Sequence, residues 1–299
     1  MRLKSLAKAM ILTMAFGVCV GCLGQTSTYA AAKKTVKYSL SKKGTLTVSG
    51  KGKMKKKYDH NKKIKKVIIK KGITSIPSHA FEGCKKLKSV KISKTVKKIG
   101  EYSFAGIKAK KIIVPKTVKT INTRAFINNK LDYLEIPGNV KVKGTTYNGF
   151  SCVYIGEAKT VQFNSPLSYK VCDIFRSKNI KVSKKDKMFV SIDGAVYTKD
   201  KKILVRVPAL RTAFTVADGC ETVYFSAFMN TAYVDDDFTF YLCDKLTNLT
   251  LPNSVKVFED NKKFASDYSA SKDFQKITIK WDGASEEQIK NIMEKIERK

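Results

Sequence analysis

The stretch "LKSVKISKTVKKIGEYSFAGI", residues 87–107, decides the fold. Leu87, Val90 and Ile92 have the spacing of a short strand whose alternate side chains point to one side. The Val and Ile of "TVKKI" begin a second inward-facing segment, and Phe104 follows in a tight turn where its ring fills the core. One such unit cannot fold alone, because ordering its backbone costs more free energy than its few buried side chains contribute.

The pattern recurs along the chain, and this recurrence explains how such a unit is stabilised. "IKKVIIKKGITSIPSHAFEGC" precedes it, and "AKKIIVPKTVKTINTRAF" and "LDYLEIPGNVKVKGTTYNGFSC" follow it. The aromatic residues at the same place in successive units are spaced by 23, 22 and 24 residues: Phe81, Phe104, Phe126 and Phe150. A period in the low twenties is typical of leucine-rich-repeat solenoids, in which stacked units complete each other's burial. We therefore predict a mainly β solenoid of 22–24-residue repeats.

These units resemble the BspA-type leucine-rich repeats of bacterial surface proteins, in which "L-x-x-[VI]-x-[IL]-P-x-x-V-x-x-I-G-x-x-A-F-x-x-C" recurs. "YSLSKKGTLTVSGKGKM" is similar to the N-terminal hairpin of that family, and "MFVSIDGAVYTKDKKILVRVPA" to a hairpin inserted between its repeat blocks. The resemblance covers most of residues 36–260, and the repeat is hard to follow in 153–187 and 229–243. It implies an exported, non-catalytic protein that binds other macromolecules, since several members are regarded as adhesins.

These patterns predict how the chain is divided. We expect an N-terminal β cap at residues 33–60, a solenoid at 61–281 with the inserted hairpin near 188–209, and a C-terminal helix at 282–299. Ser285 and Gln288 have the spacing of a capping box, and apolar residues follow at helical intervals. This apolar stripe suits either a cover for the last repeat or a dimer contact. We expect a cover, and a monomer.

The first residues predict export. A basic start, an apolar run and the small residues Ala30, Ala31 and Ala32 form the layout of a signal peptide, so we expect residues 1–32 to be removed after Ala32. In the alternative, Cys22 becomes a lipidated N-terminus. Either route predicts a secreted or cell-surface protein without a transmembrane segment in the mature chain.

Positive charge is concentrated in the first repeats. Residues 33–119 contain 28 Lys and three acidic residues, a net charge of +25, whereas residues 120–299 have a net charge of +6. The chain has 53 Lys and only 6 Arg, and Lys attracts anions as a mobile point charge rather than by the planar contacts that read bases. We expect anionic partners on host or bacterial surfaces, either proteins or polysaccharides such as teichoic acid, and no sequence-specific nucleic-acid binding. The alternative is that Lys only keeps the protein soluble.

The candidate binding residues are those that alternate with the buried ones along each strand. Stacking the repeats should bring them side by side as a stripe of Lys, apolar and aromatic side chains. They are Lys66, Ile68, Lys70, Ser89, Lys91, Ser93, Lys111, Ile113, Tyr133 and Glu135. The alternative is an ordinary solvated sheet face, because exposed apolar residues are common.

Cysteines and the two histidines offer little chemistry. Cys84 and Cys152 follow the core aromatic residue, so we interpret both as small buried plugs. His79 precedes the Ala-Phe turn at a position that we expect to be solvated. The mature chain would keep five cysteines and no CxxC pair, which favours neither a disulfide framework nor a zinc site.

No common catalytic motif is present, and we predict no catalytic residue, metal or cofactor. The one acidic cluster is Asp235, Asp236 and Asp237. It could hold calcium or belong to an unrecognised site of an accessory hydrolase or polysaccharide-processing protein, which is the alternative function, but we interpret it as a solvated loop. The only tryptophan, Trp281, is expected to seal the last strand.

Overall fold

The computed structural model describes seven ranges of the chain: 35–147, 150–152, 154–168, 174–234, 240–243, 245–259 and 277–297. From Lys34 onward the chain forms one compact unit. The expected signal peptide and the Cys22 alternative lie outside the described residues, as do Cys172 and the acidic cluster at 235–237. In the described part, no helix is both long and apolar enough to cross a membrane.

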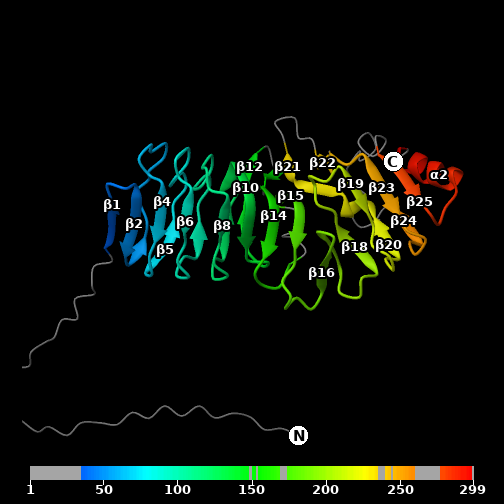
Figure 1. The fold of residues 1–299 in the computed structure, drawn as a ribbon, viewed down its shortest axis with the longest axis horizontal. Helices are drawn as coiled ribbons and strands as arrows, with labels where there is room; N and C mark the ends of the chain where they lie inside the picture. The colour runs from blue at the N-terminus through cyan, green and yellow to red at the C-terminus, as the bar shows by residue number, and fades with distance from the viewer. Residues whose placement is uncertain are drawn as a thin grey trace, which may run out of the picture. The chain divides into compact units, whose positions relative to one another are not determined.

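One side of each repeat contributes to a parallel sheet that we call the front sheet (Figure 1). Its strands follow one another in chain order: β2 (Thr45–Gly50), β4 (Lys66–Ile69), β6 (Ser89–Lys91), β8 (Lys111–Ile113), β10 (Phe126–Ile136), β14 (Gly156–Phe163) and β15 (Phe175–Lys181). Backbone hydrogen bonds join these strands into two runs, β2–β4–β6 and β8–β10–β14–β15, and β6 lies next to β8. At the N-terminal end, β1 (Val36–Leu40) pairs antiparallel with β2, where the N-terminal hairpin was expected.

The second inward-facing segment of each repeat forms the back sheet. Its strands also run parallel and in order: β3 (Gly52–Lys53), β5 (Ile73–Ile76), β7 (Lys98–Ile99), β9 (Thr120–Asn122) and β11 (Lys141–Lys143). The core lies between the two sheets, since Leu87, Val96 and Ile99 of one repeat are fully buried. Val90 is only partly buried against this core, although its spacing predicted an inward position.

A ladder of aromatic rings runs through the first core. Phe81, Phe104 and Phe126 are fully buried, and their ring centroids are 5.4 Å and 5.9 Å apart in stacked arrangements. The predicted equivalence of these three positions is thereby confirmed. Phe150 begins the short strand β13 (Phe150–Cys152), whose side chains lie outside the described residues.

The "IG" of the repeat marks a close approach between neighbouring turns. A Cβ added at Gly100 would lie 2.3 Å from the backbone nitrogen of Ser78 and 2.5 Å from the carbonyl carbon of Pro77. Because both neighbours are backbone atoms, no side-chain movement could relieve the overlap. Gly100 therefore lets one repeat stack directly against the repeat before it.

Antiparallel strands lie where the inserted hairpin was expected, near residues 188–209. They are β16 (Phe189–Ile192), β17 (Ala195–Thr198) and β18 (Ile203–Arg206), and β18 then pairs parallel with β20 (Thr222–Tyr224). β24 (Val257–Glu259) extends this sheet. The buried residues form two clusters that divide at the hairpin, with Val196 in the first and Tyr197 in the second. The repeat pattern did not predict this division.

The remaining elements complete the second half of the chain. β14 and β15 continue the parallel ladder through the region where the repeat was hard to follow. β19 (Ala213–Thr215), β23 (Asn248–Leu251) and β25 (Thr278–Trp281) form a three-stranded parallel sheet, and a short 3-10 helix spans Phe225–Ala227. Two strand pairs stand apart from the main sheets: β12 (Thr145–Tyr147) with β13, and β21 (Met229–Val234) with β22 (Phe240–Leu242).

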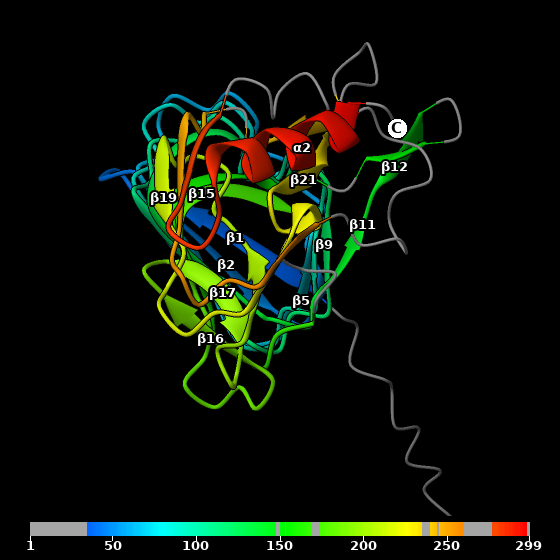
Figure 2. The ribbon, with the colours of Figure 1, turned by 90° about the vertical axis from the view of Figure 1, so that its right-hand side faces the viewer.

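The chain ends in the predicted helix, α2 (Glu286–Glu297), seen at the C-terminal end of the ribbon in Figure 2. Both hydrogen bonds of its capping box are present. The backbone N–H of Ser285 donates to Oε1 of Gln288 at 2.8 Å, and the backbone N–H of Gln288 donates to Oγ of Ser285 at 3.2 Å. That this helix covers the last repeat stays a prediction.

Candidate functional site

Strand register brings eight of the ten candidate residues side by side on the front sheet. Register pairs Lys66 with Ser89 and Ile68 with Lys91 on β4 and β6, and it pairs Lys111 with Tyr133 and Ile113 with Glu135 on β8 and β10; β6 lies next to β8. The predicted stripe is therefore present as an arrangement of side chains.

The other two candidates lie in turns rather than on strands. Lys70 follows the end of β4, and Ser93 follows the end of β6. The hydroxyl oxygen of Ser93 is 3.1 Å from that of Thr95, so its side chain is used within the turn. The alternation rule failed here because each strand stops before these positions.

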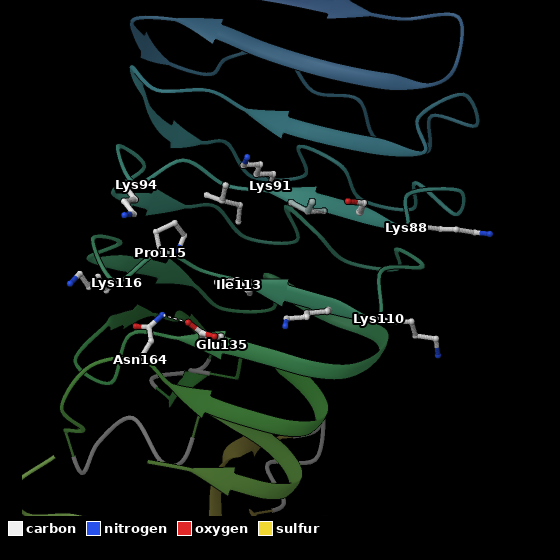
Figure 3. Close-up of a pocket in the computed structure, with 13 residues that line it drawn as sticks. Lys88, Lys91, Lys94, Lys110, Ile113, Pro115, Lys116, Glu135 and Asn164 are labelled. Carbon is white, nitrogen blue, oxygen red and sulfur yellow. Dashed lines mark hydrogen bonds between the residues drawn. The ribbon is translucent and has the colours of Figure 1, made fainter. Parts of the chain in front are cut away.

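A groove of about 680 Å³ lies over β6, β8 and β10 (Figure 3). Thirteen residues line it, and five of them were predicted from the sequence: Ser89, Lys91, Lys111, Ile113 and Glu135. The residues that the strand pattern missed come from just before the strands, from the turns and from a later repeat, and they include Lys88, Lys94, Lys110, Pro115, Lys116 and Asn164. The recurrence of Lys in "ISKT" and "VPKT" was the signal that could have identified the turn lysines.

Lysines flank the groove on both edges. Lys88 and Lys110 lie at the edge where the strands begin, and Lys94 and Lys116 lie at the opposite edge in the turns (Figure 3). Lys91 and Lys111 lie on the sheet face between these edges, and all six lysines are exposed. Glu135 is the single acidic residue of the lining. The groove is therefore strongly electropositive.

The floor of the groove is aliphatic. Ile113 is 44% exposed, although it lies in the middle of the front sheet. It is one of three large apolar side chains in the described part of the chain that are exposed, the others being Leu40 and Met188. Val90 and Pro115 also line the groove, so the apolar surface continues on either side of Ile113. Contiguous exposed apolar surface with a polar rim is typical of interaction sites.

Glu135 is held in place at one side of the groove. Its Oε2 accepts a hydrogen bond from the Tyr133 hydroxyl at 3.1 Å, and its Oε1 accepts one from Nδ2 of Asn164 at 3.1 Å. Nδ2 of Asn164 also donates to the carbonyl oxygen of Val114 at 2.9 Å, and Nζ of Lys111 lies 4.8 Å from the centre of the Tyr133 ring. Burial, followed by the hydrogen bond to Glu135, raises the pKa of Tyr133 to about 12. The hydroxyl therefore remains protonated, and donates to Glu135, at neutral pH.

Cys84 is a buried structural residue, as predicted. It is fully buried, and its Sγ donates to the carbonyl oxygen of Tyr58 at 3.0 Å. Burial is the main cause of its raised pKa, so the thiol loses its proton less readily than an exposed cysteine. Cys220 and Cys243 are also buried. The side chain of Cys152 lies outside the described residues.

His79 is directed toward residues other than Cys84. Its Nδ1 lies 2.6 Å from Oε2 of Glu82, and its ring stacks on Tyr102 at a centroid distance of 5.2 Å. The side chain is 41% exposed, so the position is half-buried rather than simply solvated. His79, Tyr102 and Arg124 have φ angles of 58°, 50° and 57°, which identifies them as the same left-handed turn residue in successive repeats.

Elsewhere, Trp281 lies at the end of β25 with its ring edge-on to Phe258 at 6.0 Å. It is partly buried against the second core, consistent with the predicted sealing of the last strand. Among the residues that the structure describes, no group of three or more His, Cys, Asp or Glu side chains is arranged to hold a metal ion.

Stacked repeats of 22–24 residues, with one strand in each of two parallel sheets and an aromatic ladder between them, define a leucine-rich-repeat protein. The family described as "BspA type Leucine rich repeat region" matches this chain in six copies, over residues 54–181 and 213–280. The chain belongs to this family.

Several solved structures are similar to the chain. A leucine-rich repeat protein from Eubacterium ventriosum is 19% identical, with a TM-score of 0.42, and the match covers 83% of this chain and 70% of that protein. The pneumococcal vaccine antigen PcpA is 17% identical, with a TM-score of 0.39 and coverage of 84% and 69%. A leucine-rich cell surface protein from Faecalibacterium prausnitzii is 20% identical, with a TM-score of 0.32 and coverage of 75% and 70%. No curated protein matches the chain significantly.

Proposed function

We propose that this protein is an exported, non-catalytic binding protein of the cell surface, which holds anionic macromolecules against the front sheet of its Lys-rich first half. Its partners would be proteins or anionic polysaccharides, such as teichoic acid, on host or bacterial surfaces. The protein would act as a monomer, secreted after cleavage at Ala32 or anchored at Cys22. Family membership supports this class of function, because BspA-type proteins are commonly surface adhesion or binding proteins.

The observation that carries the proposal is that the groove lysines lack acidic partners. Among the described residues, none of the six forms an ion pair with a carboxylate; Nζ of Lys110 donates to the carbonyl oxygen of Lys130 at 3.4 Å, and its charge contributes, after Lys159, to the lowered pKa of Asp132. A cluster of six cations whose lining contains one carboxylate, Glu135, repels itself and does not stabilise the fold. An anionic partner would relieve this repulsion.

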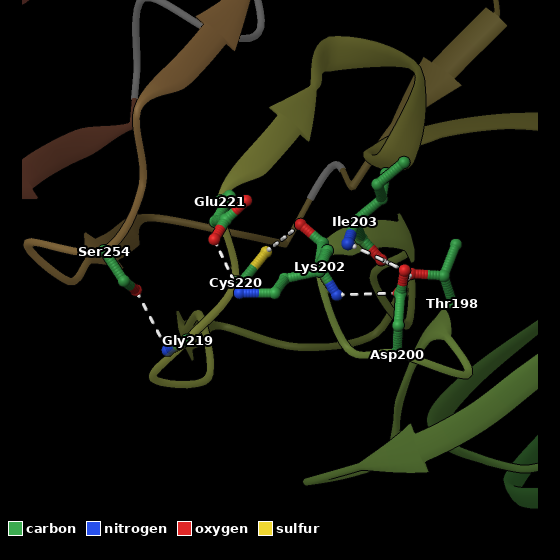
Figure 4. Close-up of polar contacts among 8 residues, drawn as sticks. All are labelled: Thr198, Asp200, Lys202, Ile203, Gly219, Cys220, Glu221 and Ser254. Atoms are coloured by element: carbon green, nitrogen blue, oxygen red, sulfur yellow. Dashed lines mark hydrogen bonds and ion pairs between the residues drawn. The ribbon is translucent and has the colours of Figure 1, made fainter.

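Basic residues farther along the chain have acidic neighbours. Nζ of Lys159 lies 2.8 Å from Oδ1 of Asp132, and Nζ of Lys202 lies 2.5 Å from Oε1 of Glu221 (Figure 4). The latter contact lowers the pKa of Glu221 and raises that of Lys202.

Charge neutralisation in the full-length chain tests the proposal. One variant replaces Lys88, Lys91, Lys110 and Lys116 by Gln, and a matched control replaces the exposed residues Lys184, Lys185, Lys187 and Lys199. Affinity for purified teichoic acid or a sulfated polysaccharide is measured from about 50 to 200 mM salt, because released counterions make such affinity fall with salt. We expect the groove variant to lose about tenfold or more in affinity at low salt, with a shallower salt dependence. The control should behave as the wild type.

Two results would contradict the proposal. Equal losses in both variants would mean that the lysines act as diffuse charge. Binding that does not respond to salt would exclude the electrostatic account altogether.

A further inference from the structure

We propose that the groove over β6, β8 and β10 is a binding site for an extended acidic peptide segment with one aliphatic side chain. That side chain would pack against Ile113, which acts as its anchor. This inference rests on the proposed function, since it names the partner class for the same groove. It selects a protein partner over a polysaccharide.

The floor of the groove favours an acidic peptide over an anionic polysaccharide. Ile113, Val90 and Pro115 expose carbon atoms, and none of the thirteen lining residues is aromatic. A sugar chain lying there would bring hydroxyl groups against aliphatic surface, where they would lose hydrogen bonds to water without replacement. An aliphatic side chain of a peptide would instead gain the free energy of removing apolar surface from water.

The positions of the lysines fit an extended chain in length. Lys94 lies six positions after Lys88, and Lys116 lies six positions after Lys110. A fully extended chain would span roughly 20 Å over six positions, and the turns at Lys94 and Lys116 make the distance between the two edges shorter than this. A peptide of about seven residues lying along the strands would therefore reach both lysine edges, with its central residue over Ile113, which Figure 3 shows between those edges.

Glu135 limits the groove on the side of β10. Its carboxylate is fixed by Tyr133 and Asn164, so it cannot turn away from an approaching acid. A second carboxylate placed there would be repelled. The acidic residues of the peptide should then lie over β6 and β8, where Lys91 and Lys111 lie on the face and the other four lysines lie along the edges.

The test uses the full-length chain and two labelled seven-residue peptides. Both have acidic residues at each end, and they differ only in a central leucine or serine. Fluorescence anisotropy at about 50 mM salt, where charge attraction is weakly screened, gives their affinities. We expect the leucine peptide to bind about fivefold more tightly than the serine peptide, as the burial of one or two methylene groups implies.

Ile113→Thr should abolish this preference for leucine, so that the variant binds the leucine and serine peptides with equal affinity. Ile68→Thr is the matched control, since Ile68 also lies on the front sheet but does not line the groove. The control should keep the fivefold preference. Both variants should keep the wild-type melting temperature to within a few degrees, which shows that they are folded.

The possible outcomes separate the two proposals. Equal affinity of the wild type for both peptides, together with weakened binding in the groove Lys→Gln variant, would overturn the peptide-binding site and leave the proposed function intact. An affinity for all anionic probes that does not respond to that variant would overturn both. Weaker polysaccharide binding in Ile113→Thr would assign the site to a sugar chain. A dimer that Ile113→Thr dissociates, seen by sedimentation, would assign it to a second copy.

Discussion

Phe104 is the residue on which the stacking of the first repeats depends most. It is fully buried, and its ring lies between those of Phe81 and Phe126. No single repeat can shield such a ring, so each phenylalanine is buried by the units on either side of it. The aromatic ladder therefore couples neighbouring repeats.

Phe104→Ala should lower the free energy of unfolding by about 3–5 kcal/mol, because it removes a buried ring and leaves a cavity that rigid neighbours cannot fill. Chemical denaturation followed by circular dichroism measures this. Ile113→Thr, on the exposed face, should change the stability by less than about 1 kcal/mol. Similar losses for the two substitutions would mean that the ladder does not couple the repeats.

For single residues, the sequence predicted the buried core far better than the lining of the groove. Phe81, Phe104 and Cys84 were identified because burial repeats with a fixed period. The contact between Glu135 and Asn164 joins residues 29 positions apart, and its formation depends on the turn geometry of a later repeat. The left-handed turn residues such as His79 were missed for a similar reason, since they share a backbone conformation and no side-chain chemistry.

Among the elements, both hairpins were expected from the family resemblance, and the C-terminal helix was predictable from its local capping-box and apolar pattern. The division of the core at β16–β18 was not, because it depends on which cluster each face of the hairpin packs against. β17 shows this directly: Val196 belongs to the first cluster and the adjacent Tyr197 to the second. Tyr197 is anchored there, since its hydroxyl oxygen accepts a hydrogen bond from the backbone N–H of Ala217 at 3.0 Å.

The capping box of α2 can be tested by Ser285→Ala. This substitution removes the acceptor for the Gln288 N–H, and losing a cap of this kind costs about 1 kcal/mol. The amide hydrogen of Gln288 should therefore exchange with deuterium about fivefold faster. Amides of β20 provide an internal control and should be unaffected. Unchanged exchange at Gln288 would show that other contacts hold the start of the helix.

For the whole molecule, the main feature is the uneven distribution of charge over a regular scaffold. The repeats place Lys at equivalent positions around β6 and β8, and this series ends at β10, where Glu135 stands on the sheet face and Asp132 pairs with Lys159. Sequence counting predicted the excess charge of the first half. It could not show that the groove lysines lie around one apolar floor, because that depends on the lateral packing of separate repeats.

Lysine footprinting tests most directly the central claim, which is that the groove lysines bind an anionic partner. The full-length chain is acetylated at low extent with and without a bound polyanion, and mass spectrometry gives the reactivity of each lysine. The account predicts that Lys88, Lys91, Lys94, Lys110, Lys111 and Lys116 lose most of their reactivity, while Lys184, Lys185 and Lys199 keep theirs. Uniform protection of all exposed lysines, or protection confined to the second half of the chain, would contradict it.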